Sequence, residues 1–330
     1  MRAYAIRRLV LIIPTLILVT IIVFLLVRFI PGSALDQMVL QMAEYSEYGK
    51  ELNVDLLKKQ LGLDQPLHIQ YGRWAGFLPQ EDGKFKGVLQ FDLGESLWMN
   101  RSVNSLIAER LPVSIELGLL ALIIALAMAF PIGIYSAIRQ DSLADYTGRS
   151  VAILMLSVPG FWLATMIFVY PSIWWGWTPS VRLIPFVDNP IGNLGMFIIP
   201  AFLMGASMSG GLMRMIRTMM LEVLRQDYVR TAYSKGLKER TVVINHALKN
   251  AFVPIITMIG PMLLLLVSGA VIMEQIFSLP GMGQLMITAL NRRDYPVISG
   301  INLMIGTIVM FVILAVDLSY AWLDPRIRYT

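Results

Sequence analysis

The residue types that most often carry covalent chemistry are scarce in this sequence. It contains no cysteine, which excludes disulfides, thiolate metal sites and cysteine nucleophiles, and it has two histidines, His68 and His246. Three long apolar stretches lie between these histidines. Three crossings would place the two histidines on opposite sides of a membrane. There they can form neither a zinc site nor a serine–histidine–acid set. The sequence therefore predicts no catalytic residue, no metal site and no cofactor bound by this chain.

Two carboxylates lie where a charge is costly. Glu116 and Asp317 fall inside or at the ends of apolar stretches, and an ionisable side chain there favours a role in a transport path or a proton relay. Both are close to an end of their stretch. Structural pairing or solvation at the membrane interface is therefore the alternative.

Small and amide side chains are the remaining polar candidates. The cluster at 205–211 would let helices approach closely, and the alternative is that it lines a translocation path. Asn302 could hydrogen-bond between helices or face the same path. The predicted path residues are Gly205, Ser207, Ser209, Gly210 and Asn302.

The elements that must position these residues are membrane helices. The 330 residues are 56% hydrophobic and 15% charged, whereas a soluble chain is about a quarter charged. A bilayer core needs about 20 apolar residues in a helix. Six stretches approach or meet that length: 9–30, 113–138, 151–170, 194–213, 253–272 and 300–318. We predict an all-α integral membrane protein with six transmembrane helices, the first a retained anchor because its apolar run is too long for a signal peptide.

The basic residues predict the orientation of these helices. Lys and Arg gather in cytoplasmic loops, and here they gather at both chain ends and in alternate loops, above all in 214–252. Both termini are therefore predicted to be cytoplasmic. This topology explains the net charge of +5 without a nucleic-acid partner. The tryptophans at 174, 175 and 177 fit the membrane interface.

Four parts follow from this topology. We expect a cytoplasmic N-terminus with the first helix at 1–30, a small extracytoplasmic cap at 31–112, a five-helix permease core at 113–323 and a cytoplasmic tail at 324–330. Within the cap, 54–61 is predicted to be helical and 79–87 to form a polar turn. Prolines are expected to bend or break the membrane helices at Pro14, Pro131, Pro159, Pro200 and Pro261.

The loop 214–252 is longer than a simple turn requires. Residues 222–237 have helical composition, Gly236 permits a sharp change of direction, and 239–251 predicts a second helix that stops before Pro254. Two short helices meeting at a glycine form a knob suited to a groove on a partner. Alternatively, Gly236 is a plain helix C-cap, and Arg214 and Arg217 are interfacial anchors.

The same loop carries a specific resemblance. Tyr228-Val-Arg-Thr-Ala-Tyr-Ser-Lys-Gly236-Leu, followed by Asn250-Ala-Phe-Val-Pro254, resembles the coupling loop of binding-protein-dependent ABC importers, most closely the dipeptide/oligopeptide permease branch. Where the general importer motif begins Glu-Ala-Ala, this chain has Arg230-Thr231-Ala232, which suits the peptide branch. Other motifs agree along nearly the whole chain: Gly62-Leu-Asp-Gln-Pro66, Gln70-Tyr71, Asp92-Leu-Gly-Glu-Ser96, Glu274-Gln-Ile-Phe-Ser-Leu-Pro-Gly-Met-Gly283, Asp294-Tyr-Pro296 and Tyr320-Ala-Trp-Leu-Asp-Pro-Arg-Ile-Arg328.

The resemblance implies the type I ABC importer permease fold in a bacterial or archaeal cytoplasmic membrane. It implies coupling helices that dock on one or two ABC ATPase subunits, a homologous second permease and an extracytoplasmic solute-binding protein. The coupling residues carried over are Tyr228, Arg230, Thr231, Ala232, Lys235, Gly236, Leu237, Asn250 and Pro254. Dipeptides, oligopeptides, glutathione, nickel chelates and oligosaccharides all stay open as cargo, and the permease pair could be hetero- or homodimeric.

The sequence itself also indicates that ATP is bound by other subunits and not by this chain. The phosphate-cradling pattern G-x-x-x-x-G-K-[ST] occurs nowhere in the chain, so ATP and Mg²⁺ are expected on partner subunits. Two rival functions are a secondary transporter that uses Glu116 or Asp317 as a proton carrier, and a membrane scaffold whose loop recruits a partner. The first would favour a repeat between the two halves of the chain, which the sequence does not display.

Overall fold

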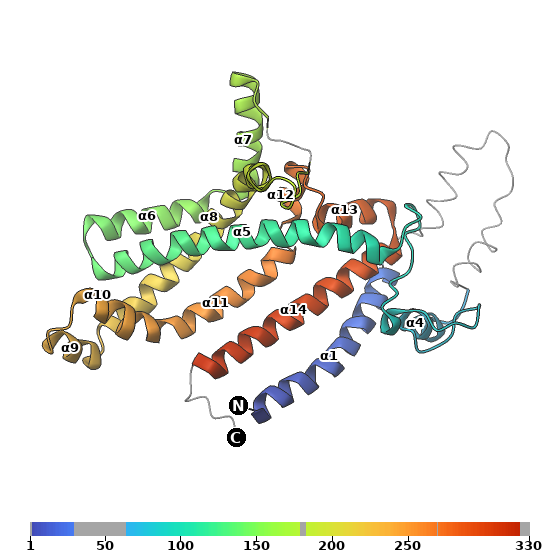
Figure 1. Cartoon of the computed structure of the whole chain (residues 1–330), viewed down its shortest axis with the longest axis horizontal. Coiled ribbons are helices and arrows are strands. Elements are labelled where there is room, and N and C mark those ends of the chain that lie inside the picture. The colour runs from blue at the N-terminus through green and yellow to red at the C-terminus, as the bar shows by residue number, and fades with distance from the viewer. Residues whose placement is uncertain (1, 30–63, 179–182, 269, 324–330) are drawn as a thin grey trace. The chain divides into compact units, whose positions relative to one another are not determined.

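The computed structural model describes residues 2–29, 64–178, 183–268 and 270–323 (Figure 1). The longest helices are α1 (Arg2–Phe29), α5 (Val103–Ile138), α8 (Pro190–Leu224) and α14 (Tyr295–Leu323). The shorter elements are α4 (Leu67–Ala75), the 3₁₀ turn η1 (Val88–Gln90), α6 (Leu143–Ser157), α7 (Gly160–Trp175), α9 (Asp227–Ser234), α10 (Glu239–Thr241), the π-helix η2 (Val242–Leu248), α11 (Lys249–Ser268), α12 (Val271–Ile276) and α13 (Met282–Arg292). Within the described ranges the regular elements are all helices, which confirms the predicted all-α class.

Four helices are long and apolar enough to cross a membrane: the candidate spans lie in α1, α5, α8 and α14. Two bent pairs are further candidates, α6 with α7 at 81° and residues 239–252 with 254–263 at 58°. The described part of the chain thus has four to six candidate spans. Each of the six predicted apolar stretches overlaps one of them.

One proline separates two helices within a predicted span. α6 ends at Ser157, Val158 is extended, and Pro159 precedes the first residue of α7. Proline disfavours the helical conformation of the residue before it, and here Val158 is extended, so the stretch at 151–170 forms two helices. By contrast, the prolines at 14, 131, 200 and 261 lie inside helices that continue past them.

The chain separates into two compact units. The first comprises residues 1–5, 112–283 and 311–330, and the second comprises residues 6–111 and 284–310. One boundary falls between Leu111 and Pro112, where the cap is predicted to end. The division of the chain into four parts stays a prediction.

The first unit has two apolar clusters that hold its helices together. One combines residues of α5, α6, α8, η2 and α11 and includes the buried Leu212, Ile216 and Ile255. The other combines residues of α5, α7, α8, α12 and the turn after α12, and it includes the buried Leu117 and Phe197. α8 contributes to both clusters, so it is the central helix of this unit.

The second unit holds the described part of the cap. Tyr71 of α4 packs edge-on against Phe24 of α1, and its hydroxyl lies 2.8 Å from the hydroxyl of Thr20. Residues 79–87 turn as predicted, with hydrogen bonds from Gln80 N–H to the Lys84 carbonyl and from Gly83 N–H to the Gln80 carbonyl, both 2.9 Å long. The helix predicted at 54–61 and the tail at 324–330 lie outside the described residues.

Candidate functional site

The predicted coupling loop contains a sharp helix–turn–helix, and we call residues 227–241 the elbow. At the end of α9, Gly236 N–H donates to the Tyr233 carbonyl (2.9 Å) and Leu237 N–H to the Ala232 carbonyl (3.4 Å). This pair of bonds is the Schellman arrangement, which needs a left-handed residue, and Gly236 has φ +76°. A Cβ at Gly236 would meet nothing within 4 Å. The backbone angle, and not lack of space, therefore requires glycine here.

The elbow differs from the predicted helices in two ways. The helix expected at 222–237 is interrupted, since α8 ends at Leu224 and the extended Gln226 precedes the first residue of α9. The helix expected at 239–251 does not stop before Pro254, because α11 continues past that proline. Pro254 lacks the N–H that would bond the carbonyl of Asn250, and the chain bends by 58° at this place instead of ending.

A small apolar interior holds the elbow against the end of α8. Val229 and Ala232 of α9 and Val242 of η2 are buried together, and Val223 and Leu224 of α8 pack against them. Ala232, one of the predicted coupling residues, therefore lies inside the elbow. It positions the exposed residues and is not itself available to a partner.

The opposite side of α9 is exposed. It carries the coupling candidates Tyr228, Arg230 and Thr231, and the exposed turn after α9 carries Lys235 and Leu237. The Asp227–Arg230 ion pair, 3.7 Å long between two largely exposed side chains, adds little to stability. Figure 1 shows α9 and α10 beyond the ends of α8 and α11.

One hydrogen bond ties the elbow to the next helix. Asn250 Nδ2 donates to the Tyr228 hydroxyl at 3.0 Å and to the His246 carbonyl at 2.8 Å. The coupling motif contains both Tyr228 and Asn250, but the sequence did not predict a contact between them. The structure thus joins both halves of the predicted coupling motif across 22 residues of chain.

The path candidates of α8 lie at close helix contacts. A Cβ on Gly205 would come within 2.5 Å of the Ala121 carbonyl oxygen, and one on Gly210 within 2.6 Å of the Ala152 carbonyl oxygen. Ser209 is buried and donates to the Ala206 carbonyl. These contacts agree with the packing alternative, although a role in the path stays a prediction.

The other two path candidates are half-buried. Ser207 is on α8 in the first unit, whereas Asn302 is on α14 in the second unit. Asn302 Nδ2 donates to the Ile298 carbonyl of its own helix at 2.9 Å. Glu116 and Asp317 are likewise half-buried.

Three buried carboxylates have partners that the sequence analysis did not identify. Asp145, Glu274 and Asp294 each accept a hydrogen bond from a serine hydroxyl, from Ser136, Ser114 and Ser96 respectively. Glu274 and Asp294 belong to quoted motifs, but sequence spacing could not reveal partners more than 150 positions away. A local signal for Asp145 exists, because Ser142-x-x-Asp145 has the form of a helix N-cap.

The motif that follows Glu274 closes around that side chain. The Ser114 hydroxyl donates to Glu274 at 2.6 Å and accepts from the Met282 N–H at 2.8 Å. A Cβ at Gly281 would come within 2.4 Å of the Glu274 carboxylate, so only glycine fits at this position. The first glycine in the Pro-Gly-Met-Gly run is thus explained by its close approach to a buried carboxylate.

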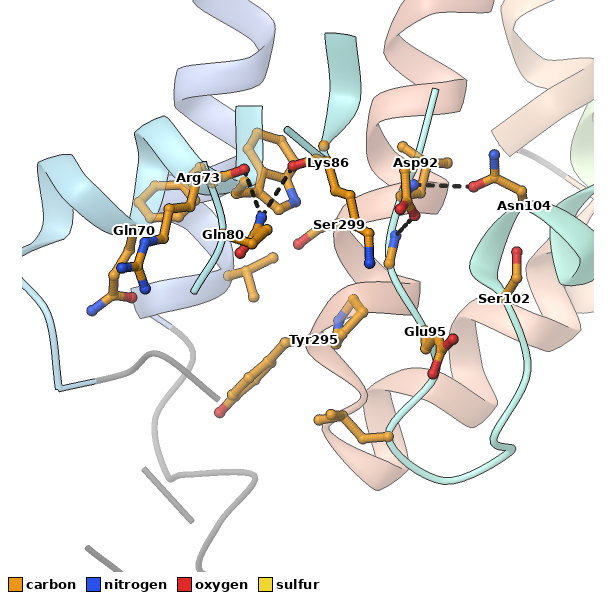
Figure 2. A pocket seen from close by; sticks show the side chains of 18 of the residues that line it. Gln70, Arg73, Gln80, Lys86, Asp92, Glu95, Ser102, Asn104, Tyr295 and Ser299 are labelled. Atoms are coloured by element: carbon orange, nitrogen blue, oxygen red, sulfur yellow. Dashed lines mark hydrogen bonds between the residues drawn. The ribbon is translucent and has the colours of Figure 1, made fainter. Parts of the chain in front are cut away.

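The second unit contains a cavity of about 910 Å³ among α1, α4, α14 and the cap loops (Figure 2). Its lining carries both signs of charge, and Figure 2 shows Arg73 on one side and Asp92 and Glu95 on the other. The backbone N–H of Lys84 donates to Asp82 and lowers the pKa of that carboxyl, and Lys86 adds to the effect. In the described ranges, no group of three or more His, Asp or Glu could hold a metal ion.

Comparisons with known proteins match nearly the whole chain. Residues 129–329 match the family described as the binding-protein-dependent transport system inner membrane component, and residues 1–118 match the N-terminal region of such components. A protein of Brucella abortus (strain 2308), provisionally named a peptide transport system permease, is 39% identical over the full length of both chains. The dipeptide transport system permease protein of Escherichia coli (strain K12) is 37% identical over 100% of this chain and 99% of its own.

The fold also matches a solved structure. An inward-facing form of the MetNI methionine ABC transporter superposes with a TM-score of 0.53 and 14% identity, covering 67% of this chain and 97% of that one. This likeness supports the predicted ABC importer permease fold.

Proposed function

This chain belongs to the family of inner membrane components of binding-protein-dependent transport systems, and from that membership we propose that the elbow receives mechanical work from an ATPase subunit. The chain is the permease subunit of a peptide-type ABC importer, a multi-pass inner membrane protein and not an enzyme. Such a component works with an ATPase and a binding protein. An ion-driven transporter and a passive scaffold are therefore excluded as its function.

The proposed orientation places the elbow and both termini in the cytosol. The clustering of Lys and Arg in 214–252 supports this orientation, because such clusters stay on the cytoplasmic side. The segment 31–112 then lies outside, where a binding protein delivers solute. ATP and Mg²⁺ are held by the ATPase subunits.

The construction of the elbow is the observation that carries the proposal. A surface that transmits force must be rigid in itself and exposed to its partner. The buried Val229, Ala232 and Val242 supply the rigidity, and the Schellman turn at Gly236 fixes the angle between α9 and α10. The exposed side of α9 offers aromatic, basic and apolar groups to a groove.

The proposed mechanism is alternating access with a homologous second permease. ATP-driven closure of the ATPase pair draws the two elbows together, and the helix bundles turn from inward- to outward-facing. The solute passes between the two permeases. The names of the relatives support peptides or similar small solutes as cargo.

A glycine pair in this chain offers a matched experiment. Gly236 and Gly176 each lie just after a helix, and both have positive φ, at +76° and +65°. A Cβ at either glycine would meet nothing within 4 Å. Proline fixes φ near −65°, so each substitution disrupts one turn equally. In proteoliposomes with the ATPase and binding protein, Gly236→Pro is expected to abolish uptake and transport-coupled ATP hydrolysis. Gly176→Pro should retain both.

Exposed charges give a second experiment. Reversal of both Arg230 and Lys235 to glutamate should leave membrane insertion intact and abolish uptake, whereas Arg230→Lys with Lys235→Arg should preserve it. Normal uptake in Gly236→Pro and in the charge-reversed variant would contradict the proposed role of the elbow.

A further inference from the structure

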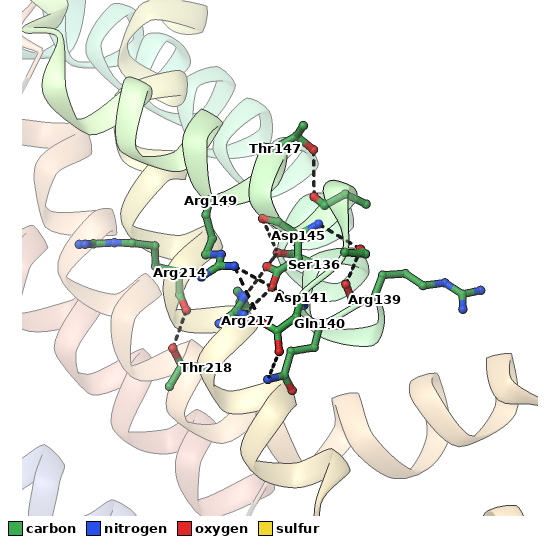
Figure 3. Close-up of polar contacts among 12 residues, drawn as sticks. Ser136, Arg139, Gln140, Asp141, Asp145, Thr147, Arg149, Arg214, Arg217 and Thr218 are labelled. Carbon is green, nitrogen blue, oxygen red and sulfur yellow. Dashed lines mark hydrogen bonds and ion pairs between the residues drawn. The ribbon is translucent and has the colours of Figure 1, made fainter.

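The buried Asp145 joins three helices of the first unit (Figure 3). Arg217 of α8 donates to both of its oxygens, from Nε and Nη2, each at 2.7 Å. The Ser136 hydroxyl of α5 donates to one oxygen, and the Asp141 N–H of the α5–α6 turn donates to the other at 3.0 Å. Arg149 Nη2 lies 3.3 Å from the same carboxylate. Four hydrogen bonds therefore fill the acceptor positions of Asp145 with donors from α5, the turn and α8.

The backbones around this carboxylate approach one another at glycines. A Cβ on Gly133 of α5 would come within 2.9 Å of the Met213 carbonyl of α8, and one on Gly210 of α8 within 2.6 Å of the Ala152 carbonyl of α6. One on Gly148 of α6 would lie 3.3 Å from the Ser136 hydroxyl of α5. Each pair among the three helices thus has a close contact at a glycine. This close packing leaves little room for one helix to slide past another.

Arg217 is close to the elbow along α8. It lies about two turns before α8 ends at Leu224, and α9 begins three residues later at Asp227. A second contact joins the end of α8 to the α5–α6 turn, since Arg225 Nη2 donates to Gln140 Oε1 at 3.4 Å. A displacement of α9 therefore reaches α8 first and then the α5–α6 turn through these contacts.

We infer that the Asp145–Arg217 pair is a positioning pin that makes α5, α6 and α8 move as one body when the elbow is displaced. This inference rests on the proposed function of the elbow. A buried ion pair is weak evidence for stability, because apolar residues of similar volume often stabilise as well. A two-bond guanidinium fork, however, fixes both distance and direction between two helices. That property suits a joint through which force passes.

The pin predicts a loss of coupling without a loss of assembly. Arg217→Lys keeps the charge but not the fork, and Ser136→Ala removes one donor. Arg214→Lys is the matched control, because Arg214 is one turn away on the exposed side of α8. In proteoliposomes with the ATPase and binding protein, solute transported per ATP should fall about tenfold in Arg217→Lys and less in Ser136→Ala. Co-purification with the ATPase should be unchanged, and Arg214→Lys should transport like the parent chain.

Asp145→Asn should likewise lower transport per ATP. If Arg217→Lys and Ser136→Ala both transport at the parent ratio, the pin is overturned, whether or not Asp145→Asn assembles. That outcome is separable from failure of the elbow, since Gly236→Pro would still uncouple. Normal coupling in Gly236→Pro would instead remove the premise on which the pin rests.

Discussion

Asp145 and Asp294 are both buried aspartates that accept a hydrogen bond from a serine hydroxyl, yet their surroundings differ in charge. Asp145 faces the guanidinium groups of Arg217 and Arg149. The hydrogen bonds that Asp294 accepts among the described residues come from neutral donors, the Ser96 hydroxyl and the Leu97 N–H at 3.2 Å.

The two aspartates also join different kinds of segment: Asp145 joins helices to one another, and Asp294 joins a loop to a helix corner. The bonds of Asp145 link α5, α6 and α8 in the unit that contains the elbow. The bonds of Asp294 attach the cap loop near Ser96 to the α13–α14 corner, together with a bond from Trp98 Nε1 to the Arg292 carbonyl at 2.8 Å. A charged pair thus holds the region proposed to move, and neutral bonds close a loop in the other unit.

The largest expected effect follows from removal of the charged acceptor. Asp145→Leu removes the carboxylate that accepts two hydrogen bonds from the partly buried Arg217, and it should lower the free energy of unfolding by about 3 kcal/mol. Asp145→Leu with Arg217→Leu should recover much of that loss, because the remaining Arg149 is more than a third exposed and still lies 4.0 Å from Asp141. Thermal unfolding of the purified complex in detergent measures both. An equal loss in the single and double variants would show that charge does not distinguish this site.

A smaller effect should separate the two serines. Ser96→Ala removes one of two donors described for Asp294, and loss of a hydrogen bond to a buried acceptor costs about 1–3 kcal/mol. Ser136→Ala should cost less, since Asp145 keeps both bonds from Arg217. Ser96→Ala should leave transport per ATP unchanged. A lower transport ratio in this variant would mean that the cap junction also transmits force.

Removal of the Tyr228 hydroxyl tests the tie between the elbow and α11. Tyr228→Phe loses the bond to Asn250 at a partly exposed site, so the cost should stay below about 1 kcal/mol. We expect a small fall in uptake at unchanged expression. Asn250→Ala in the Tyr228→Phe background should add little if this bond is what both residues contribute.

The smallest effect is expected at the surface ion pair of α9. Asp227→Asn breaks the 3.7 Å contact with Arg230, and exposed pairs contribute little because water and salt screen them. Neither the unfolding midpoint nor uptake should change measurably. A strong loss of uptake would place Asp227 itself among the coupling residues.

Regular features of the fold were predictable from the sequence. The apolar stretches predicted the membrane helices, since about 20 apolar residues are needed to cross a bilayer. The glycine after Lys235 predicted the change of direction, because few other residues adopt positive φ. The break at Pro159 follows from the same local chemistry.

Long-range features were not predictable in this way. The Asp145–Arg217 fork joins residues 72 positions apart, and the Ser96–Asp294 bond joins residues 198 positions apart. Arg217 was interpreted as an anchor or a partner contact, whereas it bonds within the unit. Continuation of α11 past Pro254 depends on packing against η2 and α8, which no local pattern records.

Cross-linking of the elbow to the ATPase tests the central claim most directly. The chain has no cysteine, so Lys235→Cys and, in the cap turn, Lys84→Cys each introduce a unique thiol. With the assembled complex in native membranes, a short thiol-to-amine cross-linker should join position 235 to the ATPase and leave position 84 unjoined. Position 235 should also resist impermeant reagents added from outside. Labelling of position 235 from outside, or a cross-link to the ATPase from position 84 alone, would contradict the account.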